Sequence, residues 1–352
     1  MTSSPGKAYP RVQAAWLSGP RFDLGFVVGI ALLAAALSLC TVRDPDLFWP
    51  VLTLHTWLFG YEHLVATYTR LLVHPADRAR FRTLTLLAPP LMLAGLAAVG
   101  LRYGLRGIYA LYFVGQWHHT VRQSWGLAQQ YRRKAGGLPW DSPLWSQVTM
   151  WSVPLWGLLH RCAQRPSEFL FQPFALPPCP SWLVTLGALA SGLLWLHFAA
   201  TRMAAYRRGE LALGHTLYMV SHLLVFLGGY VLIDELCSGW LLVNVWHNVQ
   251  YIVFVWLYNR WRFAHGLDPQ ARLLSWLSQP GSLRAVLYGL ASIALALPLY
   301  YLLPRLGLLV DRFLVDAAVP AALTIGLTFT FHHYLVDAVI WKRPRTEPPA
   351  AR

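Results

Sequence analysis

Histidines with nearby carboxylates and amides recur inside five long apolar stretches of this chain. One stretch reads LHTWLFGYEHLVATYTR, another FVGQWHHTVRQSWG, and a third FHHYLVDAVIWK. Ionisable groups are expensive to place in apolar surroundings, so such residues are by default candidates for function. The residues concerned are His55, Glu62 and His63; His118, His119 and Arg122; His215 and His222; His247; and His332, His333 and Asp337.

Imidazoles supplemented by a few carboxylates are a ligand set for iron, zinc, copper or nickel. The four cysteines offer no CxxC pair, so a thiolate metal site is not expected. We predict a histidine site for a metal, most consistent with one or two non-haem iron ions. The predicted ligands are His55, His63, His118, His119, His222, His247, His332 and His333, with Glu62, Asp337 and Arg122 as the catalytic or supporting charged groups.

The elements that position these residues are predicted to be transmembrane helices. Hydrophobic residues make up 56% of the chain and charged residues only 12%, against about 25% charged in a soluble domain. The apolar residues form blocks of the length that a helix needs to cross the hydrocarbon core, about 20 residues. The sequence therefore predicts an all-α, polytopic integral membrane helical bundle.

About ten spans are expected, and arginines concentrate in every second loop. By the positive-inside rule this places both termini in the cytoplasm of a cell with an inner (plasma) membrane. Residues 1–21 and 342–352 would be cytoplasmic ends, and 22–341 one transmembrane domain. The predicted spans are Phe22–Cys40, Phe48–Val73, Leu84–Leu101, Ile108–Tyr131, Leu144–Cys162, Trp182–Ala200, Leu211–Ile233, Trp240–Trp261, Leu283–Leu303 and roughly Asp316–Trp341.

The net charge of +14 does not indicate nucleic-acid binding, because the arginines are scattered beside hydrophobic segments rather than gathered on one face. Cys162 and Cys179 border one predicted outer loop, where a disulfide is compatible with an oxidising compartment. Free thiols used as small apolar residues are the equal alternative.

Five of the histidines are predicted to lie at a similar depth in the membrane. Counted to the cytoplasmic end of each span, His63, His119, His222, His247 and His333 lie between 8 and 14 residues away. That spread corresponds to about 9 Å along a helix axis. Five helices are therefore predicted to place an imidazole in one slab, although polar packing between helices uses the same residue types.

The spacing of the charged residues along each helix predicts hydrogen-bond partners for some of the histidines. His55 and Glu62 are seven residues apart and are predicted to share a helix face, whereas His333 and Asp337 are four apart. A carboxylate in such a position can accept the imidazole N–H and so fix the ring's tautomer. Glu62 and Arg122 lie at similar predicted depth and could neutralise each other. Neighbouring histidines point about 100° apart, so one member of each adjacent pair should face the centre.

In outline this pattern resembles integral-membrane iron oxygenases of the desaturase and hydroxylase type, which hold iron between helices with histidines. This sequence lacks the regular HxxxH and HxxHH boxes of those enzymes. Its own histidine motifs read WHH, WHN and HHYLVD. The expected activity is an O₂-using oxidoreductase acting on a lipid or isoprenoid-like substrate, with electrons from a separate donor.

Three alternatives stay open at this point. Paired histidines could ligate haem in an electron-transfer protein. Buried His and Glu could relay protons or metal ions in a transporter. The Trp246–Asn248 tripeptide faintly resembles the Trp-His element of membrane-bound O-acyltransferases.

Overall fold

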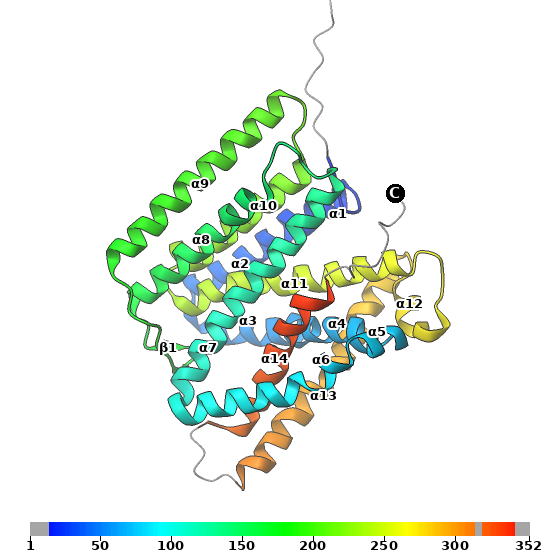
Figure 1. The fold of residues 1–352 in the computed structure, drawn as a ribbon. Helices are drawn as coiled ribbons and strands as arrows, with labels where there is room; N and C mark the ends of the chain where they lie inside the picture. The colour runs from blue at the N-terminus through cyan, green and yellow to red at the C-terminus, as the bar shows by residue number, and fades with distance from the viewer. Residues whose placement is uncertain (1–13, 314–318, 342–352) are drawn as a thin grey trace, which may run out of the picture. The chain divides into compact units, whose positions relative to one another are not determined.

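The chain is almost entirely helical, as predicted, in a computed structural model that describes residues 14–313 and 319–341 (Figure 1). Residues 1–13 of the predicted N-terminal end, the whole predicted tail 342–352, and residues 314–318, where the tenth span was predicted to begin, lie outside the described residues. The helices are α1 (Pro20–Leu24), α2 (Ile30–Arg43), α3 (Phe48–His55), α4 (Tyr61–Leu72), α5 (Pro75–Arg80), α6 (Arg82–Leu86), α7 (Ala88–Lys134), α8 (Pro143–Gln164), α9 (Ser181–Arg207), α10 (Leu213–Leu227), α11 (Leu236–Arg262), α12 (Arg272–Leu277), α13 (Ser282–Asp311) and α14 (Ala321–Ile340).

Short irregular pieces complete the fold. Segments of π-helix join α1 to α2 (Gly25–Gly29) and α3 to α4 (Thr56–Gly60), and a third extends α10 (Gly228–Leu232). Two 3₁₀ turns cover Pro45–Leu47 and Pro269–Ala271. The two-residue strands β1 (Glu168–Phe169) and β2 (Gln172–Pro173) form one antiparallel hairpin.

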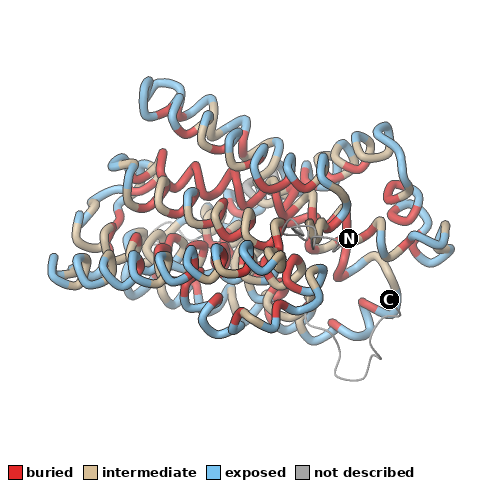
Figure 2. The backbone as a smooth tube through the Cα atoms, turned by 90° about the horizontal axis from the view of Figure 1, so that it is seen from above, coloured by how far each residue is buried: buried red, intermediate tan, exposed pale blue. Residues whose placement is uncertain are grey.

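Seven helical stretches in the described residues are long and apolar enough to cross a membrane. Large apolar side chains on them are exposed, among them Leu32, Leu101 and Leu193. Exposed turns alternate with buried ones along the long helices (Figure 2). Contiguous apolar exposure of this kind marks a surface for lipid, so the chain is a helical membrane protein. The seven stretches are Pro20–Arg43, Ala88–Lys134, Ser181–Arg207, Leu213–Leu232, Leu236–Arg262, Ser282–Asp311 and Ala321–Ile340.

The chain divides into two compact units. Unit 1 comprises Met1–Leu39, Ser124–Arg165 and Pro177–Val243, and unit 2 comprises Cys40–Gln123, Pro166–Leu176 and Asn244–Arg352. Within unit 1, α8 packs along α9 and also contacts α10. Within unit 2, α13 packs against α14 and α4, and α4 contacts α14. Helices α7 and α11 contribute to both units.

One glycine breaks the longest helix. Gly104 has φ 63° and ψ −159° inside α7, a conformation that costs little only without a Cβ. The break lies between the predicted spans Leu84–Leu101 and Ile108–Tyr131, which the sequence treated as separate helices. All four cysteines are free thiols in the structure, which is the alternative to a Cys162–Cys179 disulfide that the sequence left open.

Replacing Gly104 by alanine is expected to destabilise the protein by about 1–3 kcal/mol, because the new Cβ forces the residue into strained backbone space. No atom lies within 4 Å of the position that this Cβ would take, so the cost comes from the backbone alone. Thermal unfolding in detergent measures the effect. Gly95→Ala, in the regular part of α7 and also without near neighbours, is the control, and an equal loss in both variants would contradict the backbone explanation.

Candidate metal centre

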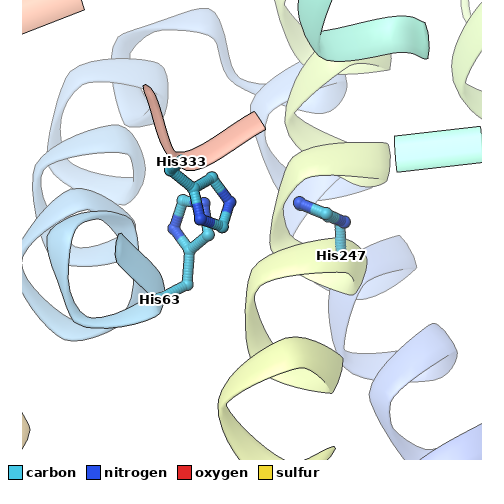
Figure 3. Close-up of side chains that lie close together, drawn as sticks. All are labelled: His63, His247 and His333. Carbon is cyan, nitrogen blue, oxygen red and sulfur yellow. The ribbon is translucent and has the colours of Figure 1, made fainter. Parts of the chain in front are cut away.

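Four histidines from four helices converge in unit 2. His63 on α4, His119 on α7, His247 on α11 and His333 on α14 are all buried. The centroid of the His333 ring lies 4.6 Å from the centroid of the His63 ring and 4.6 Å from that of the His119 ring. The ring centroids of His119 and His247 are 5.0 Å apart. Figure 3 shows His63, His247 and His333 pointing toward one another from their separate helices.

Ligand atoms are close enough to share an ion. One nitrogen from each of His63, His247 and His333 lies within 4.8 Å of the others, and His119, His333 and Asp337 form a second such group. The Nε2 atoms of His119 and His333 are 3.1 Å apart. Two cis ligands at the usual metal–nitrogen length of about 2.0–2.1 Å would be separated by about 2.9–3.4 Å. The His119–His333 distance therefore suits two ligands of one metal ion.

The same distance argues against haem between these two rings. Axial histidines on opposite faces of a haem iron would place their ligating nitrogens about 4 Å apart, with the macrocycle between them. The Nε2 atoms of His119 and His333 are only 3.1 Å apart, which leaves no space for a haem macrocycle between the two rings. The four rings fit a compact non-haem centre better.

Hydrogen bonds orient the rings toward the centre. The Nδ1–H of His63 donates to the carbonyl of Gly60, which leaves Nε2 with the free lone pair. His247 has a buried Nε2 without a hydrogen-bond partner in the described part of the chain. A buried polar atom without a partner costs about 1–3 kcal/mol, and coordination to a metal would remove that cost.

A second polar layer lies one helical turn beyond the histidines. Thr67, Tyr251 and Asp337 each follow a cluster histidine by four residues on the same helix. The Tyr251 hydroxyl donates to Asp337 Oδ1 at 2.6 Å, and Thr67 donates to the same oxygen at 3.1 Å. These bonds require that α4, α11 and α14 run in the same direction, because otherwise the i+4 positions would lie at opposite ends of the cluster.

This layer sets the tautomer of His333, one of the possible ligands. Thr67 Oγ1 lies 2.7 Å from His333 Nδ1. When Asp337 is ionised, the Thr67 proton goes to the carboxylate, so the hydroxyl oxygen accepts from His333 Nδ1–H. His333 Nε2 then carries the lone pair and faces His119. Such outer partners orient a ligand and raise its basicity.

On the other side of the histidines, the amide of Gln116 donates to Asn244 Oδ1. Gln116 and Asn244 precede His119 and His247 by three residues, so this bond ties α7 to α11 one turn above the cluster. Gln123, four residues after His119, is placed like Thr67 and Tyr251, but its Oε1 is buried without a partner among the described residues.

Several predicted site residues lie elsewhere. His118 is exposed on α7, next to the buried His119. Both ring nitrogens of His332 are engaged, Nδ1 with Tyr68 Oη at 2.8 Å and Nε2 with the Leu84 carbonyl at 2.9 Å. These two neighbours therefore face away from the converging rings, which answers the question of which member of each pair points inward.

His222, predicted to be a ligand, belongs to unit 1. Its Nε2 donates to the carbonyl of Met150 at 2.9 Å, and its ring packs on Phe226. His215, seven residues before His222, is also in unit 1. The similar depth predicted for His222 therefore does not identify it as a partner of His63, His119, His247 and His333, since neither group of possible ligand atoms includes it.

A π-helical segment changes the face on which His55 and Glu62 lie. Thr56–Gly60 holds about one residue more per turn than an α-helix. The predicted alignment of His55 with Glu62, seven residues on, is therefore lost. The extra residue instead aligns His55 with His63, eight residues on. His55 is buried, and its Nε2 accepts from the side-chain amide of Asn248, the neighbour of His247, at 3.2 Å.

Glu62 is buried, and neither carboxylate oxygen has a hydrogen-bond partner within residues 14–313 and 319–341. Arg122 is exposed on α7, so the predicted mutual neutralisation of Glu62 and Arg122 is not seen.

Sequence reasoning gave no role to Thr67 or Tyr251. The signal that would have identified them is the polar residue four positions after each clustered histidine. Comparison with protein-family models, with curated proteins and with solved structures found no match to this chain. Function is therefore inferred from the chemistry of the site itself.

Proposed function

We propose that this protein is an integral-membrane, non-haem iron oxidoreductase that uses O₂ to oxidise a hydrophobic, lipid or isoprenoid-like substrate. The observation that carries the proposal is the convergence of four buried imidazoles from four helices, with two Nε2 atoms 3.1 Å apart. Iron fits this neutral nitrogen-rich set, because imidazole suits iron and four protein ligands leave positions open for exchangeable ones.

Each residue of the site has a defined task in this proposal. His63, His119, His247 and His333 hold the metal, and Asp337 with Thr67 and Tyr251 keeps the His333 lone pair turned toward it. A bound iron ion would supply the redox chemistry with O₂. The chain's own apolar helices exclude water from the reaction and admit a hydrophobic substrate from the bilayer. Electrons come from a separate donor.

We further propose ten spans with both termini in the cytoplasm of an inner membrane. Gly104 divides α7 into two helices, which adds one to the seven membrane-length stretches. The continuous stretch from α3 to α4 and the 22-residue helix α8 supply the remaining two. With ten spans, every second loop is arginine-rich, in agreement with the positive-inside rule.

Metal content is the first test of the iron site. Protein purified in detergent from iron-replete cells is expected to contain about one iron per chain, because both groups of possible ligand atoms, His63–His247–His333 and His119–His333–Asp337, share His333. Elemental analysis gives the metal, and an absorption spectrum without a Soret band supports the non-haem site. A folded protein that contains no metal and binds none on addition of Fe²⁺ under anaerobic conditions would contradict the proposal.

A further inference from the structure

Aromatic side chains connect the clustered histidines with one end of unit 2. The ring centroid of Tyr251 lies 5.5 Å from that of His333 and 6.1 Å from that of His63. The ring centroid of Trp341 lies 6.3 Å from that of Tyr251 and 5.0 Å from that of Tyr258. Tyr251 is fully buried, whereas Trp341 and Tyr258 are partly exposed. Three successive ring contacts thus lead from His333 to Tyr258.

Tyr258 borders a charged network at this end of the unit. The guanidinium carbon of Arg70 lies 5.5 Å from the Tyr258 ring centroid, within the range of a cation–π contact. Arg70 forms an ion pair with Asp77, which also accepts a hydrogen bond from Arg262 Nη1 at 2.7 Å. Arg262 lines a hollow with a volume of about 300 Å³. The path that begins at the histidines therefore ends at this hollow.

Two segments of unit 2 form the hollow. His74, between α4 and α5, lines it from one segment, and residues 262–268, at and after the end of α11, line it from the other. His74 Nε2 lies 3.5 Å from Asp268 Oδ2. This contact and the bond between Arg262 and Asp77 join the two segments into one surface.

The surface around the hollow is strongly basic. Residues 74–82 and 260–272 together carry six arginines and two aspartates. Asp77 is buried, whereas four of the arginines are exposed, namely Arg78, Arg80, Arg82 and Arg272. A surface field of one sign attracts a partner of the opposite sign and accelerates its association. The charge of this surface therefore complements an acidic partner.

We infer that this basic surface is the docking site of the electron donor, a small soluble one-electron carrier with an acidic face. The inference rests on the proposed function, because it assigns the place where the electrons required by that function enter. Each transfer oxidises the carrier by one electron and reduces the bound metal by one, and no atom changes place. The rings of Tyr258, Trp341 and Tyr251 shorten the gaps across which the electron tunnels and are not themselves reduced.

Charge alone would also attract anionic lipid headgroups. The succession of rings from the hollow to the histidines favours an electron carrier, because a lipid headgroup would have no use for it. All the residues of the surface and of the ring contacts belong to unit 2.

Docking is measured first on the metal-free, full-length protein in phosphatidylcholine nanodiscs, so that the result does not depend on iron. The probe is a fluorescently labelled plant-type ferredoxin, an acidic one-electron carrier, and fluorescence anisotropy gives the dissociation constant. Binding should weaken between about 0.1 M and 1 M salt, over which the Debye length falls from about 10 Å to about 3 Å. Cytochrome c, a basic one-electron carrier, is expected not to bind.

Two double variants locate the docking surface. Arg80→Glu with Arg272→Glu reverses one exposed charge on each segment and should weaken ferredoxin binding roughly tenfold or more, because rim charges steer association. Arg102→Glu with Arg106→Glu makes the same change of charge at exposed positions beside Gly104 and should have no effect. Equal loss in both double variants would indicate attraction to the net charge of the whole protein and would overturn the inference.

Absence of ferredoxin binding at low salt would overturn the inference as well. Loss of co-purified phosphatidylglycerol from the Arg80→Glu, Arg272→Glu variant would then assign the surface to lipid headgroups.

Electron entry is followed on the iron-loaded protein without O₂ or substrate. Excess reduced ferredoxin is mixed with the ferric protein, and its reoxidation is read from its own visible absorbance. Trp341→Leu removes the middle ring and should lower the saturated rate severalfold, with iron content and ferredoxin affinity unchanged. Trp256→Leu removes an aromatic ring of α11 that packs on Arg260 instead and should leave the rate unchanged. Tyr258→Leu is the substitute if Trp341→Leu loses iron or unfolds.

Ferredoxin that binds but is not reoxidised by protein of normal iron content would overturn the inference. An unchanged saturated rate in both Trp341→Leu and Tyr258→Leu would overturn the path through the rings. A protein that binds ferredoxin through Arg80 and Arg272 but holds no iron would support the docking surface and contradict the proposed function. The two failures are therefore distinguishable.

Discussion

His119→Ala and His333→Ala are each expected to lower the affinity for iron by about 100-fold or more. Loss of an outer partner of a metal ligand already costs about 10–100-fold, and these variants remove the ligand itself. The Nε2 atoms of these two residues are 3.1 Å apart, so either deletion leaves the other nitrogen facing a void. Bound iron after equilibrium dialysis against a graded Fe²⁺ buffer gives the affinity.

His118→Ala is the matched control, because His118 is the exposed neighbour of His119 on the same helix. It should retain iron at the level of the unmodified protein. The alanine variants must also keep their helical circular dichroism, so that lost metal is not confused with lost fold. Normal iron affinity in both folded alanine variants would remove His119 and His333 from the ligand set.

Thr67→Val is expected to weaken iron binding by about 10–100-fold although Thr67 is not a ligand. Valine has nearly the same shape, so packing is preserved while the hydroxyl is lost. His333 Nδ1 then has no acceptor at 2.7 Å, and Asp337 loses one of its two donors. The His333 ring is free to adopt the other tautomer, in which Nε2 carries the proton and cannot bind metal.

Thr69→Val provides the comparison on the same helix. Thr69 is also buried, but its hydroxyl donates to the backbone carbonyl of Ala66 at 2.7 Å. Its replacement should lower thermal stability without changing the affinity for iron. Equal affinity in Thr67→Val and the unmodified protein would show that the hydroxyl does not position His333.

The convergence of His63, His119, His247 and His333 follows from information that the sequence contains. A histidine at a given depth in an apolar helix is limited to a thin slab, because the membrane fixes the axial position of each span. The alternation of arginine-rich loops predicts that the four helices run in the same direction. Their i+4 positions therefore meet as well, which explains why Thr67, Tyr251 and Asp337 form one layer.

The sequence did not show which histidine of each adjacent pair faces the other helices of the site. His118 and His119, or His332 and His333, have the same depth and residue type, and differ only in rotation about the helix axis. That rotation depends on the packing of the whole helix. On α14, His332 is held by Tyr68 and Leu84, while His333 turns to His119. Depth alone also grouped His222 with the others, although it belongs to unit 1 and bonds to Met150.

The sequence by itself thus determined the all-α membrane class and four of the five residues expected to converge. The tertiary structure decided in which direction around its helix axis each residue points. The π-helical segment Thr56–Gly60 shows why: one extra residue rotates everything before it by roughly a quarter of a turn. Hydropathy is insensitive to that rotation, because an apolar helix stays apolar on every face. Only contacts with α7, α11 and α14 distinguish the face that holds His63 from the one that holds Glu62.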